Sequence, residues 1–438
     1  MAFDSFLKRL EDAEPADISR FVAGICPTWV DSALRMSGKA TIRKRKLPAD
    51  KAIWLVIGAA LFANKSLWRV VEHMRLVIDG LIAPSAVVRA RLKLGSEPLR
   101  LLFHAVATAW NRMGEQPWRG LALYGLDGSH LRVDDSEANS EHFGRPKCRS
   151  SAGYPQMRMV ALMNLTSRIL AGAEAGPWAR GEVTLARGLW NTIPDHSLTI
   201  IDRAFLSTAI LLQVLSQGHD RHFLIRLKKN TRYQVIRLLA DGSALATIAV
   251  PREVRAANPQ APKTITVRLI AYQHPGGEAG ILMTSLRDPT EYPAAELISV
   301  YHKRWELEVA FDELKTHMLL RKEALRSKTV DGVYQEFWAI MLVYNLVRRE
   351  MAVVAESKGL CPSRVSFTGA FLMIHNFFAA ASIASMPGVL PRELAELEEQ
   401  LGRSMILPPR RSERRCPRQV KVKMSNYKKA PPRHSVAA

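Results

Sequence analysis

Residues 121–129 read LALYGLDGS, an apolar run that ends in an aspartate, a glycine and a serine. Three further runs of β-type residues follow at 130–133, 157–162 and 168–173. Short apolar runs bounded by Gly, Asp and Ser are typical of strands, and three adjacent strands are the simplest arrangement of these segments. Asp127 would then stand at the end of the first strand.

The chain continues with a helical stretch at 178–189 and the segment LTIID at 198–202, an apolar strand that ends in Asp202. A helix at 205–216 and a strand at 222–227 are expected next. Three strands, helix, strand, helix and strand is an order typical of a mixed sheet flanked by helices. The sequence therefore predicts an α/β fold of the ribonuclease H-like class, although a fold alone implies no reaction.

The length of 438 residues favours two or three structural units. Apolar positions at three-to-four spacing predict helices before the sheet and again after residue 293. Residues 229–292 are β-rich and contain many Pro and Gly. We expect a helical N-terminal DNA-binding domain at 1–115, a catalytic core at 116–228 and 293–395, an inserted β subdomain at 229–292, and a basic tail at 396–438.

The charge is strongly positive, with 62 Lys plus Arg against 41 Asp plus Glu and a formal net charge of +21. Such a balance indicates a polyanionic partner, with nucleic acid first, although some merely basic proteins share it. Two cationic runs are candidates for phosphate contact. They are the tail segment Arg410 to Arg433 and the loop residues Arg43, Lys44, Arg45 and Lys46.

The four cysteines show no CxxC spacing, so neither a disulfide framework nor a zinc site is predicted. The first residues lack the pattern of a signal peptide. Residues 367–386 carry no charge, but their polar side chains favour a buried helix over a membrane span. These observations favour a cytoplasmic protein without membrane contact.

Position selects the acids that could carry chemistry. Asp127 and Asp202 both follow apolar strands, and in a sheet with these strands adjacent the two carboxylates would share one edge. Each could instead cap a turn or the following helix, as most Asp residues in such places do. Their value as a pair depends on a third acid.

The third acid stands in the segment YHKRWELEVAFDELK, residues 301–315. On one continuous α-helix, its residues Tyr301, Arg304, Glu308 and Lys315 would lie at roughly 0°, 300°, 340° and 320°. A phenol, two cations and a carboxylate in one stripe suit a phosphodiester beside a metal-binding acid, although an exposed ion-paired face would look the same. Asp312, near 20° by the same count, is not excluded by geometry.

The spacing Y-(2)-R-(3)-E-(6)-K in this segment resembles the signature of the insertion sequence 4 family of bacterial DDE transposases. Asp127-Gly128-Ser129 and Asp202-Arg203-Ala204-Phe205 look like the first and second acid motifs of that family. The resemblance runs through nearly the whole chain and selects Glu308 over Asp312. One departure is Gly280, where some relatives carry a base-stacking tryptophan.

The resemblance implies a cut-and-paste DNA transposase with two Mg²⁺ ions, which Mn²⁺ could replace, held by Asp127, Asp202 and Glu308. Tyr301, Arg304 and Lys315 would contact DNA, and Arg226 and Lys228 are weaker candidates because they end the strand beside Asp202. Double-stranded DNA and a second copy of the chain are the implied partners. Two alternatives stay open: a transposase-derived DNA-binding protein that no longer cuts, and a ribonuclease H-like nuclease without strand transfer.

Overall fold

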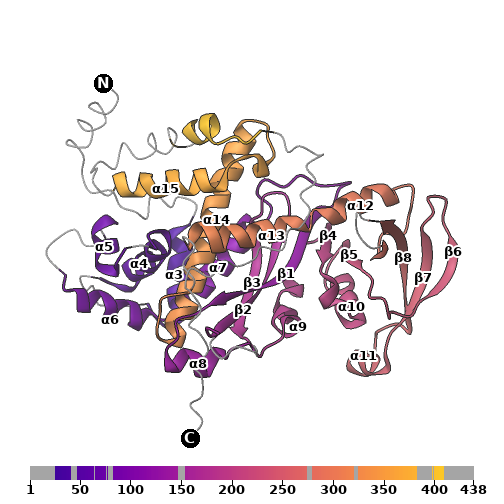
Figure 1. Cartoon of the computed structure of the whole chain (residues 1–438), viewed down its shortest axis with the longest axis horizontal. Coiled ribbons are helices and arrows are strands. Elements are labelled where there is room, and N and C mark those ends of the chain that lie inside the picture. Colours follow the sequence, from indigo (N-terminus) through magenta and orange to yellow (C-terminus); the bar gives the residue numbers. More distant parts are fainter. Residues whose placement is uncertain are drawn as a thin grey trace, which may run out of the picture. The chain divides into compact units, whose positions relative to one another are not determined.

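The computed structural model describes residues 25–40, 47–63, 65–74, 76, 82–146, 153–273, 279–319, 324–381, 397 and 399–408 (Figure 1). The chain up to Leu407 forms one compact unit. A second unit, Pro408–Ala438, lies outside the described residues except for its first residue. The predicted domain boundaries within the first unit stay predictions.

The described N-terminal region is helical. Proline opens α3, α6 and α7, where its missing N–H costs nothing because the first helical donors have no partner within the helix. Helix α4 is apolar on nearly every side and is buried along most of its length, as expected of a helix surrounded by others. The helices are α3 (Pro27–Met36), α4 (Ala49–Leu61), α5 (Leu67–His73), α6 (Pro84–Leu94) and α7 (Glu97–Trp110).

The strands of the described chain form one sheet in the order β3-β2-β1-β4-β5-β9-β8-β7-β6. The pairs β1–β4 and β4–β5 are parallel, and the other pairs are antiparallel. The bounds are β1 (Ala122–Arg132), β2 (Gln156–Asn164), β3 (Leu170–Pro177), β4 (Ser197–Ile201), β5 (Arg221–Arg226), β6 (Gln234–Leu238), β7 (Ala244–Ala249), β8 (Thr264–Gln273) and β9 (Ala279–Thr284).

One strand prediction is wrong. The runs at 121–126 and 130–133 belong to the single strand β1, so Asp127 lies inside a strand and not at its end. Antiparallel pairing with β2 continues without a break from Tyr124 to Arg132, and it holds Gly128 extended where a turn was expected. Parallel pairing with β4, however, stops at Leu126.

Strands β6 to β9 fall in the predicted β-rich segment and continue the same sheet through the pair β5–β9. Between β1 and β5 the helices are α8 (Glu137–Phe143), α9 (Glu182–Leu185) and α10 (Thr208–Ser216), with short 3₁₀ turns at Ala186–Gly188, Trp190–Thr192 and Arg203–Phe205. Within the predicted helix at 178–189, only Glu182–Leu185 are α-helical, followed by the 3₁₀ turn Ala186–Gly188. Helix α11 (Arg252–Ala257) connects β7 to β8.

The sheet has a separate apolar core on each face. One core packs α9, α10 and the 3₁₀ turns against the sheet. The other unites the opposite face with α3 to α7, α12 (Ala294–His302), α13 (Trp305–Asp312), α14 (Val330–Ser357) and α15 (Phe367–Ala381). Figure 1 shows α12 and α13 crossing one face of the sheet while α9 and α10 lie on the other side. Among the described residues, no helix is long and apolar enough to cross a membrane.

Candidate active site

The first two acids lie next to each other at the end of the parallel strands. Leu126 of β1 is paired in parallel register with Ile201 of β4, so Asp127 and Asp202 are the next residues of the two strands. Each carboxylate is also hydrogen-bonded locally: Gly128 N donates to Asp127 (2.8 Å) and Ala204 N donates to Asp202 (2.8 Å). Asp202 thus has the capping role that we weighed as the alternative, whereas Asp127 lies within β1 and accepts from the amide of the next residue.

A glycine lets the third acid approach. On one face of β1, a Cβ built on Gly125 would lie 2.7 Å from Leu307 Cδ1 and 2.8 Å from Leu165 Cδ2. Residues two apart on a strand share a face, so Asp127 points to the same side as Gly125, toward α13. A side chain at position 125 would overlap those of Leu307, the neighbour of Glu308, and Leu165 unless they moved.

The three predicted acids surround one guanidinium group. Arg304 Nη1 lies 3.3 Å from Asp127 Oδ2 and 3.7 Å from Asp202 Oδ2, and Arg304 Nη2 lies 3.1 Å from Glu308 Oε1. The side chains are 19 to 33 % exposed, so solvent still reaches them. Carboxylates from β1, the end of β4 and α13 thus converge on a single cation position.

Burial dominates the electrostatics of Asp127. Desolvation, supported by the nearby charge of Asp202, raises the pKa of Asp127 to about 6, although the Gly128 amide and Arg304 act in the opposite direction. A buried carboxylate at this position therefore favours a neighbouring positive charge. In this structure Arg304 provides that charge.

The helical wheel that grouped the third motif assumed one continuous helix, and this assumption is wrong. Helix α12 ends at His302 and α13 begins at Trp305, with Arg304 in the turn between them. The amides of Arg304 and Leu307 bond to carbonyls three residues back, which tightens the backbone there. A six-residue π-helix, Glu313–Met318, follows α13.

Lys315, on this π-helix, reaches the site from another direction. Its ammonium group donates to Ser129 Oγ at 2.6 Å, two residues beyond Asp127 on the same face of β1. Burial lowers the pKa of Lys315, as expected for an amine held away from water. Single π-turns often occur at functional sites, and this one places a lysine against Ser129 of β1.

Of the remaining predicted DNA contacts, Tyr301 and Arg226 lie near the ring of Tyr272, whereas Lys228 bonds a backbone carbonyl. Tyr301 packs its ring 5.9 Å from that of Tyr272 on β8, and the Arg226 guanidinium lies 6.0 Å from the Tyr272 ring. The charge of Arg226 is also felt at Tyr301, whose pKa is raised mainly by burial. Lys228 instead donates to the carbonyl of Leu206 (3.1 Å), just after the 3₁₀ turn that Asp202 caps.

The donor set fits a hard divalent cation. Carboxylate oxygens are the ligands that Mg²⁺ prefers, and here three carboxylates face one shared cation. In the described part of the chain, no group of three or more His, Cys, Asp or Glu side chains is arranged to hold a metal ion as it stands. In this structure the guanidinium of Arg304 lies where the three carboxylates converge.

Comparison with protein families decides the identity. Residues 15–104 match the model described as insertion element 4 transposase N-terminal, and residues 122–346 match the transposase DDE domain. The chain belongs to the insertion sequence 4 family of DDE transposases. It is therefore an enzyme of the DDE transposase class, as the motif spacing predicted.

Two relatives come from Escherichia coli strain K12. The transposase InsG for insertion sequence element IS4 is 34 % identical over 411 residues, which cover 92 % of each chain. The putative transposase InsZ is 34 % identical over 251 residues, which cover 55 % of this chain and 81 % of InsZ. A solved piggyBac transposase synaptic complex with hairpin DNA aligns with a TM-score of 0.45 and 9 % identity, covering 86 % of this chain and 82 % of that one.

Two residues of the site were not predicted from the sequence, and two predicted DNA-binding segments lie outside the described residues. Arg43 to Lys46 and the basic tail from Arg410 lie outside the described residues. The role of Gly125 and the partnership of Ser129 with Lys315 were missed. The motif DGS did point to Ser129, because a residue two positions after a strand acid shares its face.

Proposed function

We propose that this transposase cuts DNA at the ends of its mobile element and joins the freed ends to target DNA, which is cut-and-paste transposition. The observation that carries the proposal is the convergence of Asp127, Asp202 and Glu308, from three separate elements, on one cation position. Family membership supplies the reaction class, and the acids supply a site suited to phosphodiester chemistry.

Asp127 would be the ligand shared by two Mg²⁺ ions, with Asp202 and Glu308 each holding one. Bound divalent ions supply an activated water or 3′ hydroxyl and neutralise charge on the phosphodiester that is attacked. The protein's own contribution is to hold the three carboxylates in place. The amides of Gly128 and Ala204 do this for the first two acids, and packing of Leu307 on Gly125 does it for the third.

The cationic and aromatic side chains beside the acids suit the DNA backbone. Lys315 places an ammonium group at Ser129, two residues along β1 from Asp127, where its point charge would hold a phosphate near the scissile bond. Tyr301 and Tyr272 with Arg226 form an aromatic and cationic surface of the kind on which nucleic-acid bases stack. We assign Lys228 a supporting role, because its ammonium group already bonds Leu206.

We further propose the predicted architecture for this chain: a ribonuclease H-like core at 116–228 and 293–395, a helical DNA-binding domain at 1–115 and a β insertion at 229–292. The mixed sheet with the parallel strands β1, β4 and β5 at its centre supports such a core. Because two element ends must be cut together, we propose a homodimer on DNA in the bacterial cytoplasm.

The test is to incubate the purified protein with DNA that carries its own flanking terminal repeats and Mg²⁺, with EDTA as the control. We expect metal-dependent breaks at the repeat ends, followed by joined products. Binding without breaks would favour the non-cutting DNA-binding protein. Breaks without joining, on RNA or on unrelated DNA, would favour the nuclease.

Replacing Lys315 by methionine should slow cleavage about a hundredfold and leave DNA affinity within about twofold, because positioning and not overall binding is lost. Cleavage rate and affinity are measured on the same preparation. Lys303→Met is the control, because Lys303 is exposed and its change removes the same charge nearby. Equal cleavage by the Lys315 variant and the wild type would assign Lys315 to stability alone.

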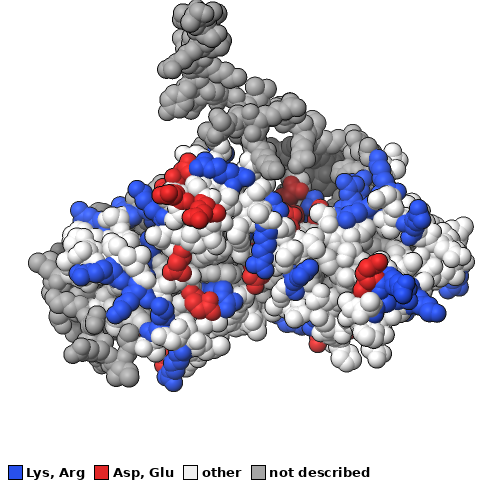
Figure 2. Space-filling model, turned by 90° about the horizontal axis from the view of Figure 1, so that it is seen from below, with Lys and Arg blue, Asp and Glu red and all other residues white. Residues whose placement is uncertain are grey.

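Removal of the tail from residue 409 onward should weaken binding to all DNA sequences alike. Figure 2 shows that Lys and Arg side chains are also spread over the face of the molecule that it draws, so binding will not vanish. Each lost phosphate contact should reduce the slope of log affinity against log salt by about 0.9. An unchanged slope would show that the tail does not contact the DNA backbone.

Arg43 to Lys46 can be tested in the same way by substitution with glutamine.

A further inference from the structure

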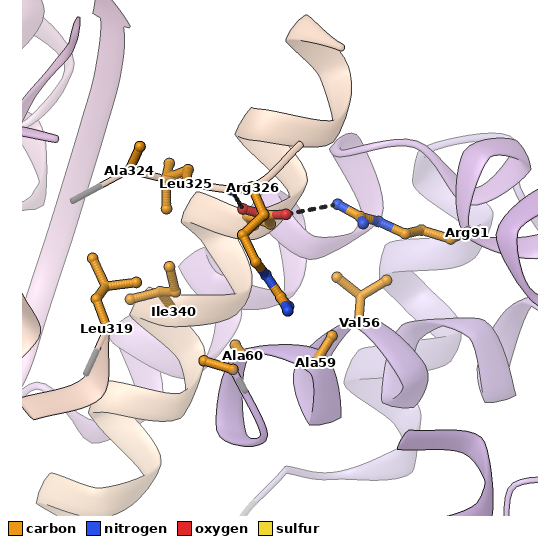
Figure 3. Close-up of a pocket in the computed structure, with 11 residues that line it drawn as sticks. Val56, Ala59, Ala60, Arg91, Leu319, Ala324, Leu325, Arg326 and Ile340 are labelled. Atoms are coloured by element: carbon orange, nitrogen blue, oxygen red, sulfur yellow. Dashed lines mark hydrogen bonds and ion pairs between the residues drawn. The ribbon is translucent and has the colours of Figure 1, made fainter. Parts of the chain in front are cut away.

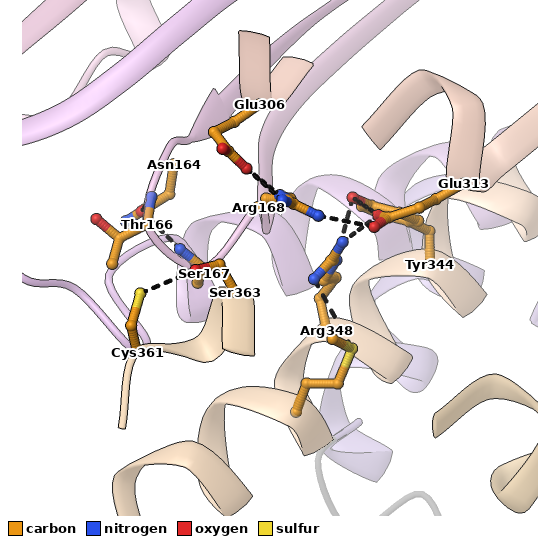
Figure 4. Close-up of polar contacts among 11 residues, drawn as sticks. Asn164, Thr166, Ser167, Arg168, Glu306, Glu313, Tyr344, Arg348, Cys361 and Ser363 are labelled. Carbon is orange, nitrogen blue, oxygen red and sulfur yellow. Dashed lines mark hydrogen bonds and ion pairs between the residues drawn. The ribbon is translucent and has the colours of Figure 1, made fainter. Parts of the chain in front are cut away.

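Behind the acid site, a cluster of buried charges holds the opposite side of the Glu308 helix. Arg168 donates to Glu306 (Nε to Oε2, 2.7 Å) and to Glu313 (Nη1 to Oε1, 2.7 Å). Arg348 donates to Glu313 and, through Nε, to the hydroxyl of Tyr344 (3.2 Å), which itself donates to Glu313 (3.3 Å). We call these five residues the anchor cluster (Figure 4).

The anchor cluster is almost dry. The Arg168 and Arg348 side chains are 5 % and 1 % exposed, and that of Glu313 is 8 % exposed. Two guanidinium groups face two carboxylates, so the charges balance. Buried ion networks give little net stability, because desolvation offsets the attraction, but removing one member leaves an uncompensated buried charge. Such a cluster therefore calls for an explanation other than stability.

The cluster connects four elements of the fold. Arg168 comes from the turn between β2 and β3, Tyr344 and Arg348 come from α14, and the two glutamates come from α13 and the π-helix. Figure 4 shows the Arg168 and Arg348 side chains meeting at Glu313 from different elements. The helix that carries Glu308 is thus tied both to the sheet and to the long buried helix behind it.

The turn that presents Arg168 has an unusual backbone. Arg168 adopts a φ of 60°, a left-handed conformation that non-glycine residues rarely take. Asn164 holds the turn, because its side-chain oxygen accepts from the amides of Thr166 (2.9 Å) and Ser167 (3.2 Å). Strained residues persist where the surroundings determine them, and here the strain directs a guanidinium group at two carboxylates.

The spacing of the glutamates gives the cluster control over the rotation of the helix. Glu306 and Glu313 are seven residues apart, about two helical turns, so they lie on one side of the helix. Glu308 is only two residues from Glu306, about 200° around the axis, and thus points to the other side. Holding Glu306 and Glu313 at Arg168 sets the angle at which Glu308 and Arg304 face Asp127.

We propose that Arg168, Glu306 and Glu313 are positioning residues for the transposase reaction, fixing the rotation and height of the Glu308 helix over β1. The proposal rests on the proposed function, in which Glu308 is a metal ligand. It assigns these residues no contact with DNA or metal. Their loss should misplace Glu308 and Lys315 together, because Lys315 follows Glu313 by two residues on the π-helix.

The experiment compares Arg168→Met, Arg168→Lys and Glu306→Gln with the wild type in two measurements below the unfolding temperature. One is Mn²⁺ affinity of the DNA-free protein, followed by electron paramagnetic resonance, and the other is cleavage of terminal-repeat DNA. We expect Arg168→Met to lose roughly 10- to 100-fold in both, the range typical of residues that orient metal ligands. Arg168→Lys and Glu306→Gln should lose less, since each keeps part of the contact.

The matched control is Arg91→Met. Arg91 is also mostly buried, at 16 % exposure, and lines the pocket of Figure 3, where it pairs with Glu336 at 3.3 Å. Its other hydrogen bonds go to Ser327, Gly332 and Gln335. It should lose stability while keeping the Mn²⁺ affinity of the DNA-free protein. A folded Arg168→Met or Glu306→Gln within twofold of the wild type, or equal losses in Arg91→Met, would overturn the positioning role. A wild type that neither binds Mn²⁺ nor cleaves would instead refute the proposed function on which this role rests.

Discussion

Asp127→Asn, Asp202→Asn and Glu308→Gln should each lower cleavage of terminal-repeat DNA by at least about a thousandfold, on the order of 4 kcal/mol of transition-state stabilisation. Each amide keeps the size of the side chain and removes the charge that a divalent ion needs. DNA affinity should stay close to that of the wild type, because the acids repel phosphate. Cleavage rate and binding are to be measured with the same DNA.

The control for this series is Asp312→Asn. Asp312 stands four residues after Glu308, and its carboxylate accepts a hydrogen bond from Thr316 (2.7 Å) on the exposed side of the helix. It lies within the same motif but does not contact Arg304. Activity near the wild-type level is expected. If Asp312→Asn were inactive and Glu308→Gln active, the third acid would have to be reassigned.

Much of this site could be predicted from the sequence because strand ends and motif spacing are local properties. The run 198–201 followed by Asp202 predicted the strand β4 and its acid, and the parallel register with β1 then placed Asp127 beside it. The break expected after Leu126 is absent, because glycine breaks a strand only where no neighbour pairs with it. Here β2 pairs with β1 on both sides of Gly128.

The parts of the site that could not be predicted depend on contacts between segments far apart in sequence, or on local changes in helix geometry. A helical wheel from Tyr301 to Lys315 could not include the tight turn at Arg304 or the π-helix after Asp312, since both change the angle per residue. Glu306 and Glu313 lie on the side of the helix away from Glu308, in the anchor cluster. Their partner Arg168 lies more than a hundred residues earlier and gave no local signal.

Replacing Arg304 by glutamine should raise the affinity for Mn²⁺ and lower the rate of cleavage. In the DNA-free protein its guanidinium lies among Asp127, Asp202 and Glu308, where the sequence predicted a phosphate clamp. A cation in that place competes with divalent ions. We therefore expect Arg304→Gln to bind Mn²⁺ about tenfold more tightly, equivalent to roughly 1.4 kcal/mol of relieved competition.

Cleavage by Arg304→Gln should nevertheless fall about a hundredfold, because the guanidinium released from the acids is the group best suited to grip a phosphate with two parallel hydrogen bonds. Arg304→Lys should restore the competition with Mn²⁺ but little of the cleavage, since an ammonium group is a point charge.

The control is Lys303→Gln, which removes the same charge from an exposed neighbour and should change neither Mn²⁺ affinity nor cleavage. If Arg304 were only a structural ion pair, Arg304→Gln would lose thermal stability without any gain in Mn²⁺ affinity, and calorimetry on the DNA-free protein separates the two. Tighter metal binding combined with slower cleavage is expected only if Arg304 pairs with the acids before the metal binds and contacts a DNA phosphate afterwards.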